Sequence, residues 1–296
     1  MDKKLLGYFC DELKRPLELI SGDISEIRMR INRPLSLICH NKAFYLTQNG
    51  EMLSSVRSDC IIISTDIINK TFEAICRYSI HSYQKDICEG FITLDGGHRV
   101  GICGTAVIKD GVIINIKNIS GLNFRAAHQV KGCAEEICNM AYSSGIKNVI
   151  IAGGPASGKT TVLRDMCRIL GQRYKVSLID ERGEIAACSG GIPQNDIGIG
   201  TDVLNGYPKA KGIETAVRVM SPDIIICDEA GGREDITAFD YAAVSGVNLA
   251  VSVHASKMED IREKIPFYKK FDYIFFLSSP SCPGIIRETV MVNRYG

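Results

Sequence analysis

The sequence has 296 residues, of which 45% are hydrophobic and 23% are charged, as in a typical soluble chain with one large or two moderate domains. Basic and acidic residues nearly cancel, 35 against 34, so the chain lacks the bulk basic excess of a typical nucleic-acid-binding domain. No apolar run approaches the ~18–20 residues of a membrane span, and Cys10, Asp11 and Glu12 interrupt the place of a signal-peptide core. These features predict a cytoplasmic protein without a nucleic-acid partner.

The first part of the chain, residues 1–126, is predicted to be a small α+β domain. A helix is expected over residues 1–20, where a leucine or phenylalanine recurs every four positions. Alternation with period two and turn residues such as Gly96-Gly97 and Asp110-Gly111 predict short hairpins downstream. The expected strands are 26–31, 35–38, 91–94, 98–103, 105–108 and 112–116, and a second helix is expected over 66–80.

The second part, residues 127–296, alternates apolar strand-like runs with helical patterns, which is typical of a mainly parallel α/β sheet. The expected strands are 147–152, 175–180, 223–228 and 248–253, and the expected helices are 131–143, 159–170, 213–220 and 233–245. Residues 273–277 and 285–292 flank a turn and are expected to form a terminal antiparallel hairpin.

A complete phosphate-loop motif lies between the first strand and helix of this second part. Its glycines allow successive backbone N–H groups to surround phosphate oxygens at a helix N-terminus. Lys159 is expected to reach the β- and γ-phosphates of ATP, and the Thr160 hydroxyl to bind Mg²⁺. The predicted nucleotide-binding residues are Gly153, Gly154, Pro155, Ala156, Ser157, Gly158, Lys159, Thr160 and Thr161.

Acidic residues and a histidine end three further strands of the predicted parallel sheet. Asp228 and Glu229 follow an apolar strand in the Walker B arrangement, where one acid holds Mg²⁺, directly or through water, and the other polarises the attacking water. Glu181 ends one neighbouring strand and His254 another. Because parallel strands bring their carboxyl ends to one edge, we expect these groups beside the phosphate loop. Either Glu229 or Glu181 is the predicted base. The alternative for Glu181 is a solvated strand end without a catalytic role, and the alternative for His254 is a structural histidine.

This order of motifs resembles the secretion and type IV pilus motor ATPases. The segments 27–34, 98–101 and 120–125 are similar to parts of the first domain of that family. Within the superfamily, residues 179–185 and 201–204 are most similar to the stage III sporulation AA proteins. The chain departs from the pilus motors in having Asp228-Glu229 where they usually carry Gly-Glu, and it lacks the four-cysteine zinc insertion of some secretion motors.

The resemblance implies a Mg²⁺-dependent ATPase with a recombinase-type core that forms a homo-oligomeric ring, with six subunits expected. Nucleotide would lie between the small domain and the core, with Arg99 and Arg125 closing on the phosphates; a surface arginine is the alternative for each. The resemblance also implies a motor for a secretion-like membrane channel complex in endospore formation, peripheral at the mother-cell side of the forespore membrane through membrane-protein partners.

Two other functions stay open at this point. One is a recombinase- or helicase-like ATPase acting on nucleic acid, and the other is an assembly scaffold that binds ATP with little turnover. Residues 189–212 are glycine-rich and without periodicity, and the sequence leaves them either as a pore-lining or partner-contacting loop or as a passive excursion.

Overall fold

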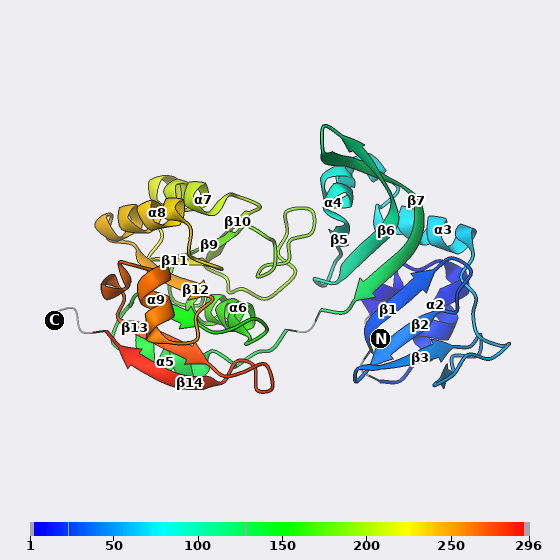
Figure 1. Ribbon diagram of the computed structural model, residues 1–296, viewed down its shortest axis with the longest axis horizontal. Coiled ribbons are helices and arrows are strands. Elements are labelled where there is room, and N and C mark those ends of the chain that lie inside the picture. Colours follow the sequence, from blue (N-terminus) through cyan, green and yellow to red (C-terminus); the bar gives the residue numbers. More distant parts are fainter. Residues whose placement is uncertain (1–2, 23, 128, 293–296) are drawn as a thin grey trace. The chain divides into compact units, whose positions relative to one another are not determined.

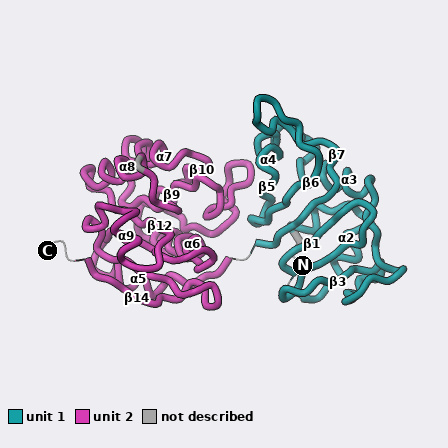
Figure 2. Tube along the Cα trace, in the orientation of Figure 1, with its two compact units in different colours: residues 1–128 teal, residues 129–296 magenta. Residues whose placement is uncertain are grey.

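Two seven-stranded sheets organise the computed structural model, which describes residues 3–22, 24–127 and 129–292 (Figure 1). Each sheet belongs to one of two compact units, residues 1–128 and residues 129–296 (Figure 2). The first unit mixes helices with an antiparallel sheet, and the second has helices on both faces of a mainly parallel sheet. The predicted fold class is confirmed.

The N-terminal sheet has the strand order β4-β3-β2-β1-β7-β6-β5, and all its pairs are antiparallel. Its strands are β1 (Ile24–Arg30), β2 (Ser36–Cys39), β3 (Lys42–Leu46), β4 (Met52–Leu53), β5 (Phe91–Thr93), β6 (Arg99–Lys109) and β7 (Val112–Arg125). Its helices are α1 (Lys3–Leu6), α2 (Asp11–Glu18), α3 (Thr65–Ile75) and α4 (Gln84–Glu89), with a 3-10 turn at Ile80–Tyr83.

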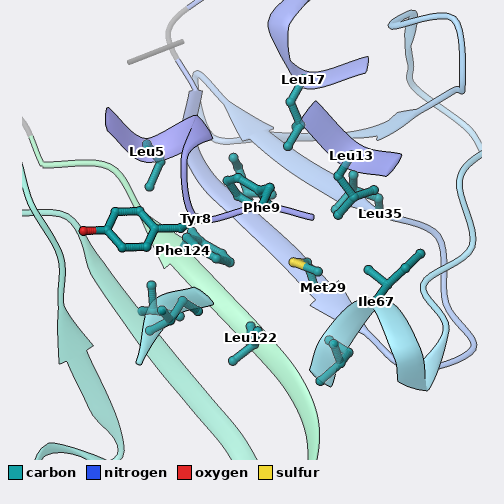
Figure 3. Packing of buried hydrophobic residues seen from close by; sticks show 14 of the residues in the cluster. Leu5, Tyr8, Phe9, Leu13, Leu17, Met29, Leu35, Ile67, Leu122 and Phe124 are labelled. Carbon is teal, nitrogen blue, oxygen red and sulfur yellow. The ribbon is translucent and has the colours of Figure 1, made fainter. Parts of the chain in front are cut away.

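The core of this unit lies between the sheet and the helices that pack on it, with residues from α1, α2, α3 and α4 (Figure 3). Phe9 is 1% exposed, and its ring centroid lies 4.4 Å from that of Phe124 on β7. The continuous helix predicted over residues 1–20 is wrong, because the chain forms α1 and α2 with a turn between them. Gly7 weakens the helix there and Cys10 takes an extended backbone, so the four-residue spacing is shared by two short helices.

The strands β6 and β7 form one long ribbon rather than the separate short hairpins predicted. They pair from Arg99 opposite Arg125 to Lys109 opposite Val112, with a register shift after Cys103 that bends the pair. The turn falls at Asp110-Gly111 as predicted. The helix predicted over 66–80 ends earlier, at Ile75, because two left-handed residues follow shortly after it.

The second sheet has the strand order β10-β9-β11-β12-β8-β13-β14, and all its pairs are parallel except β13 with β14. Its strands are β8 (Val149–Ala152), β9 (Val176–Asp180), β10 (Thr201–Asn205), β11 (Ile224–Cys227), β12 (Asn248–Val253), β13 (Tyr273–Leu277) and β14 (Ile286–Met291). Its helices are α5 (Glu135–Tyr142), α6 (Lys159–Leu170), α7 (Lys209–Thr215), α8 (Arg233–Val244) and α9 (Met258–Lys264), with a π-helical turn at Ala216–Met220 and a 3-10 turn at Tyr268–Lys270.

Both faces of this sheet are apolar and covered by helices. On β8, Val149 and Ile151 pack into the cluster on the α5 and α6 side, whereas Ile150 and Ala152 pack on the α7, α8 and α9 side. Burial on both faces explains why the strands read as continuous apolar runs. The segment 189–212, which has no sequence periodicity, is not one long loop: it contains the edge strand β10 and the start of α7, which begins four residues before the predicted helix.

Candidate nucleotide-binding site

The phosphate loop connects the fully buried strand β8 to the N-terminus of α6. Gly158, the N-cap residue of α6, has φ +92°, and a Cβ there would lie 2.7 Å from the backbone nitrogen of Gly284. Glycine is therefore required at this position by conformation and by space. The free N–H groups and the dipole of the helix terminus make this loop an anion-binding site.

Lys159 folds back over the loop that it follows. Its Nζ donates to the carbonyl oxygens of Gly153 at 3.0 Å and Gly154 at 2.8 Å, and it lies 3.3 Å from Nδ1 of His254. Burial lowers the pKa of Lys159, and the charges of Asp228 and Glu229 oppose that shift. The result is a desolvated cation at the mouth of an anion-binding loop.

Asp228 connects the loop to the Walker B strand β11. One of its carboxylate oxygens, Oδ2, accepts from Oγ1 of Thr160 at 2.6 Å. The other, Oδ1, accepts from Oγ of the fully buried Ser252 on β12. A hydroxyl and a carboxylate that meet in this way are the hard oxygen donors that Mg²⁺ prefers, and phosphates and waters usually complete its shell. These residues fit the metal that the sequence predicts.

Glu229 takes an unusual backbone conformation directly after β11. Its φ is +53°, and its N–H donates to Oδ1 of Asp228 at 3.0 Å and to Oγ of Ser252 at 2.9 Å. Its carboxylate is half-buried, with Oε1 3.3 Å from Nε2 of His254 and Oε2 2.9 Å from Arg182. The Glu229 carboxylate, which can accept a proton, is thus held between His254 and Arg182.

Lys159, Asp228, Glu229 and His254 line one cavity of about 400 Å³ together with the phosphate loop. Its lining residues are Pro155, Ala156, Ser157, Gly158, Lys159, Thr160, Thr161, Asp228, Glu229, His254 and Pro283. Pro283 was not predicted. It belongs to the turn between β13 and β14, which contacts the loop because the Gly284 N–H donates to the Ser157 carbonyl at 2.8 Å. The sequence shows this turn clearly but carries no signal that it reaches the phosphate loop.

The acids at the end of β9 divide between two roles. Asp180 is 3% exposed and accepts from the backbone N–H groups of Glu184, Ile185 and Ala186 at 2.9, 3.1 and 2.8 Å. Burial raises the pKa of Asp180, and these three bonds oppose that shift. Its carboxylate thus organises the turn after the strand. Glu181 lines a second cavity of about 20 Å³, large enough for one water molecule, together with Asp228 and Glu229.

Arg99 and Arg125 belong to the N-terminal unit. They lie directly opposite each other on β6 and β7 and therefore share one face of the sheet. The Arg99 guanidinium lies 5.1 Å from the ring centroid of Phe91, whereas Arg125 is exposed and lies opposite Glu26 of the neighbouring strand β1. Arg125 is the last residue of β7 and directly precedes residues 126–127, the last described residues of the N-terminal unit.

The phosphate loop follows β8 and the two acids follow β11, with β12 between these strands in the sheet. This arrangement defines the chain as a protein with the fold of the P-loop ATPases. The pilus retraction motor PilT, crystallised with ADP, shares that fold with a TM-score of 0.61 at 12% identity, over 93% of this chain and 78% of PilT. The ATPase DotB of Legionella pneumophila gives a TM-score of 0.55 at 16% identity, over 90% of this chain and 74% of DotB.

The chain belongs to the family described as sporulation stage III, protein AA, which it matches over residues 10–291. It is 34% identical over 278 residues to stage III sporulation protein AA of Bacillus subtilis, which covers 90% of this chain and 86% of that protein. The resemblance predicted from the motifs is confirmed. Among the described residues, no helix is long and apolar enough to cross a membrane.

Proposed function

We propose that this protein is a Mg²⁺-dependent ATPase that acts as the motor of a secretion-like channel complex in endospore formation. One observation carries the proposal: Lys159, Thr160, Asp228, Glu229 and His254, from three separate parts of the core, line a single cavity at the phosphate loop. Family membership supports the sporulation role, and the fold shared with the pilus retraction motor PilT and the ATPase DotB supports a motor.

In the proposed mechanism, the loop N–H groups and Lys159 hold the β- and γ-phosphates and offset the charge that develops on them. Thr160 and Asp228 would hold Mg²⁺, which when bound would neutralise phosphate charge and orient the phosphate oxygens. Glu229 accepts the proton of the attacking water. His254, 3.3 Å from Glu229, orients that carboxylate. Glu181 is the rival base, because it lines a cavity shared with Glu229.

The N-terminal unit supplies the remaining positive charge in this proposal. Arg99 and Arg125 share one sheet face beside the connection to the core, and a guanidinium fork matches the oxygens of a phosphate. Closure of this face on bound ATP would couple hydrolysis to movement of one unit against the other. We propose that the working form is a homohexameric ring in the mother-cell cytoplasm, held at the forespore membrane by membrane-protein partners.

Steady-state ATP hydrolysis, measured over a range of protein concentrations with and without Mg²⁺, tests the proposal. We expect hydrolysis that needs Mg²⁺ and whose rate per subunit rises with concentration, because ring assembly completes the site. Lys159→Ala removes the phosphate counter-ion and should abolish turnover without unfolding the core. Tight ATP binding without turnover would instead identify a nucleotide-dependent scaffold, and stimulation by DNA that weakens with salt would identify a nucleic-acid ATPase.

A further inference from the structure

Lys209, the first residue of α7, is a buried cation beside the candidate site. The proposed mechanism gives this lysine no role. It is only 8% exposed. Its Nζ donates to the backbone carbonyl of Glu229 at 2.7 Å and lies 3.5 Å from Oδ2 of Asp235 and 3.9 Å from Oε2 of Glu181. A buried ammonium needs such partners, since its desolvation is otherwise strongly unfavourable.

The carbonyl that Lys209 holds belongs to Glu229, which with Ala156 is one of two non-glycine residues lining the cavity that have a left-handed backbone among the described residues. A left-handed conformation such as that of Glu229, φ +53°, is strained for a non-glycine residue and persists only where its surroundings fix it. Asp235 contributes from the other side by accepting from the N–H groups of Gly231 at 3.3 Å and Gly232 at 3.1 Å. Lys209 and Asp235 together hold the main chain that follows β11.

Lys209 itself stands on a tightly packed helix. A Cβ on Gly212, one turn further along α7, would lie 2.6 Å from Cγ2 of Ile179 on β9. The helix therefore lies against the strand as closely as a glycine permits, which fixes the base of the Lys209 side chain relative to the sheet.

We propose that Lys209 is a positioning residue for hydrolysis: by holding the Glu229 carbonyl, it keeps the Glu229 carboxylate within reach of His254 and Arg182. This inference rests on the proposed ATPase function. The competing explanation is that Lys209 only balances the charges of Asp235 and Glu181. The two explanations predict different effects on kcat. If Lys209 only balances charge, replacing it together with one acid leaves kcat unchanged. If Lys209 positions Glu229, the same double replacement lowers kcat.

Four variants of the full chain test the proposal: Lys209→Met, Lys209→Arg, the double variant Lys209→Met/Asp235→Asn, and Lys211→Met as the matched control. Lys211 lies on the same helix but is exposed and pairs only with Glu214 among the contacts described. Each variant is measured for its melting temperature, for the Kd of a fluorescent ATP analogue and for kcat. The crystal structures of the double variant and of the wild type are also determined.

We expect Lys209→Met to lower kcat by about 10–100-fold, the scale of a displaced catalytic group, with the nucleotide Kd changed less than about 3-fold. The double variant should regain the melting temperature of the wild type but not its kcat. Lys209→Arg, which keeps a donor, should recover part of kcat, and Lys211→Met should match the wild type. In crystals of the double variant, Glu229 should leave the left-handed region and lose its contact with His254.

A double variant with wild-type stability and wild-type kcat, or with the Glu229 backbone unchanged in the crystal, would overturn the proposal. The proposed ATPase function and the positioning role of Lys209 can be refuted independently. Absence of ATP hydrolysis by the wild type would refute the proposed function, whereas the crystal structures would still decide whether Lys209 holds Glu229 in place.

Discussion

Two fully buried serines in the core sheet make a matched test of how the site is held together. Ser252 on β12 donates to Asp228 and accepts from the Glu229 N–H at 2.9 Å. Ser177 on β9 is equally buried, but its hydroxyl has no hydrogen-bond partner among the residues that the structure describes. Replacing each by alanine removes the same atom from the same kind of strand, with opposite consequences for hydrogen bonding.

The magnitudes follow from these partners. Ser252→Ala loses a hydrogen bond to a carboxylate, worth about 1.5–3 kcal/mol, and removes one of the two acceptors of the half-buried Glu229 N–H, so we expect a loss of about 2–4 kcal/mol in unfolding free energy. Ser177→Ala removes an unpaired buried hydroxyl, whose burial costs about 1–3 kcal/mol. We therefore expect the Ser177→Ala protein to be as stable as the wild type, or more stable by up to about 2 kcal/mol.

Scanning calorimetry of the apo proteins at pH 7 measures the difference. For a unit of this size, about 1 kcal/mol corresponds to a shift of about 2–4 °C, so the transition of the core should fall by about 5–15 °C for Ser252→Ala and should not fall for Ser177→Ala. Equal destabilisation by the two substitutions would refute the reasoning, because it would mean that the hydroxyl partners do not decide the outcome.

Three further predictions concern the chemistry. Glu229→Gln should retain ATP binding while turnover falls by about two to four orders of magnitude, and the same loss in Glu181→Gln alone would move the base to β9. Arg125→Ala in the full chain should lower kcat by about 10–100-fold in the ATPase assay with little change in melting temperature; an unchanged kcat would remove the N-terminal unit from catalysis. Lys159→Met should abolish turnover yet raise the stability of the apo protein. The pKa of Lys159 is lowered from 10.5 in the folded protein, so the wild type gains stability as pH rises through the lowered value toward 10.5. The stability advantage of Lys159→Met should therefore be largest near pH 7 and vanish near pH 10.5. Urea unfolding titrations at a series of pH values measure this difference.

The parallel sheet explains why much of the candidate site could be predicted from linear motifs. Parallel strands deliver their carboxyl ends to one edge, so a motif at each strand end is enough to bring Thr160, Asp228 and His254 together. Pro283 reaches the same cavity through an antiparallel turn, and nothing in its local sequence records what that turn contacts. The role of Lys209 could not be predicted from the sequence for another reason. Its partner is a main-chain carbonyl, which every residue possesses, so no residue type marks the contact.

The N-terminal unit was harder to predict than the core. Its apolar spacing over the first twenty residues fits one helix as well as two, and a turn that starts at Gly7 and ends in the extended backbone of Cys10 separates the two helices. The ribbon of β6 and β7 reads as two hairpins because Gly96-Gly97 and Asp110-Gly111 are both genuine turns that share the strand between them. Turn residues locate reversals of the chain, whereas strand length depends on pairing between distant residues.

The position of β8 in its sheet determines when the phosphate loop can form during synthesis. Both neighbours of β8, the strands β12 and β13, come from the last third of the core, and the turn around Gly284 that braces the loop comes later still. A nascent chain that has emerged only as far as α8 contains the entire phosphate-loop motif, but β8 has no strand to pair with on either side. Contacts between such distant residues are slow to form and leave apolar strands exposed until they do. The loop that is the earliest motif of the core in the sequence is thus among the last parts of the core to acquire its shape.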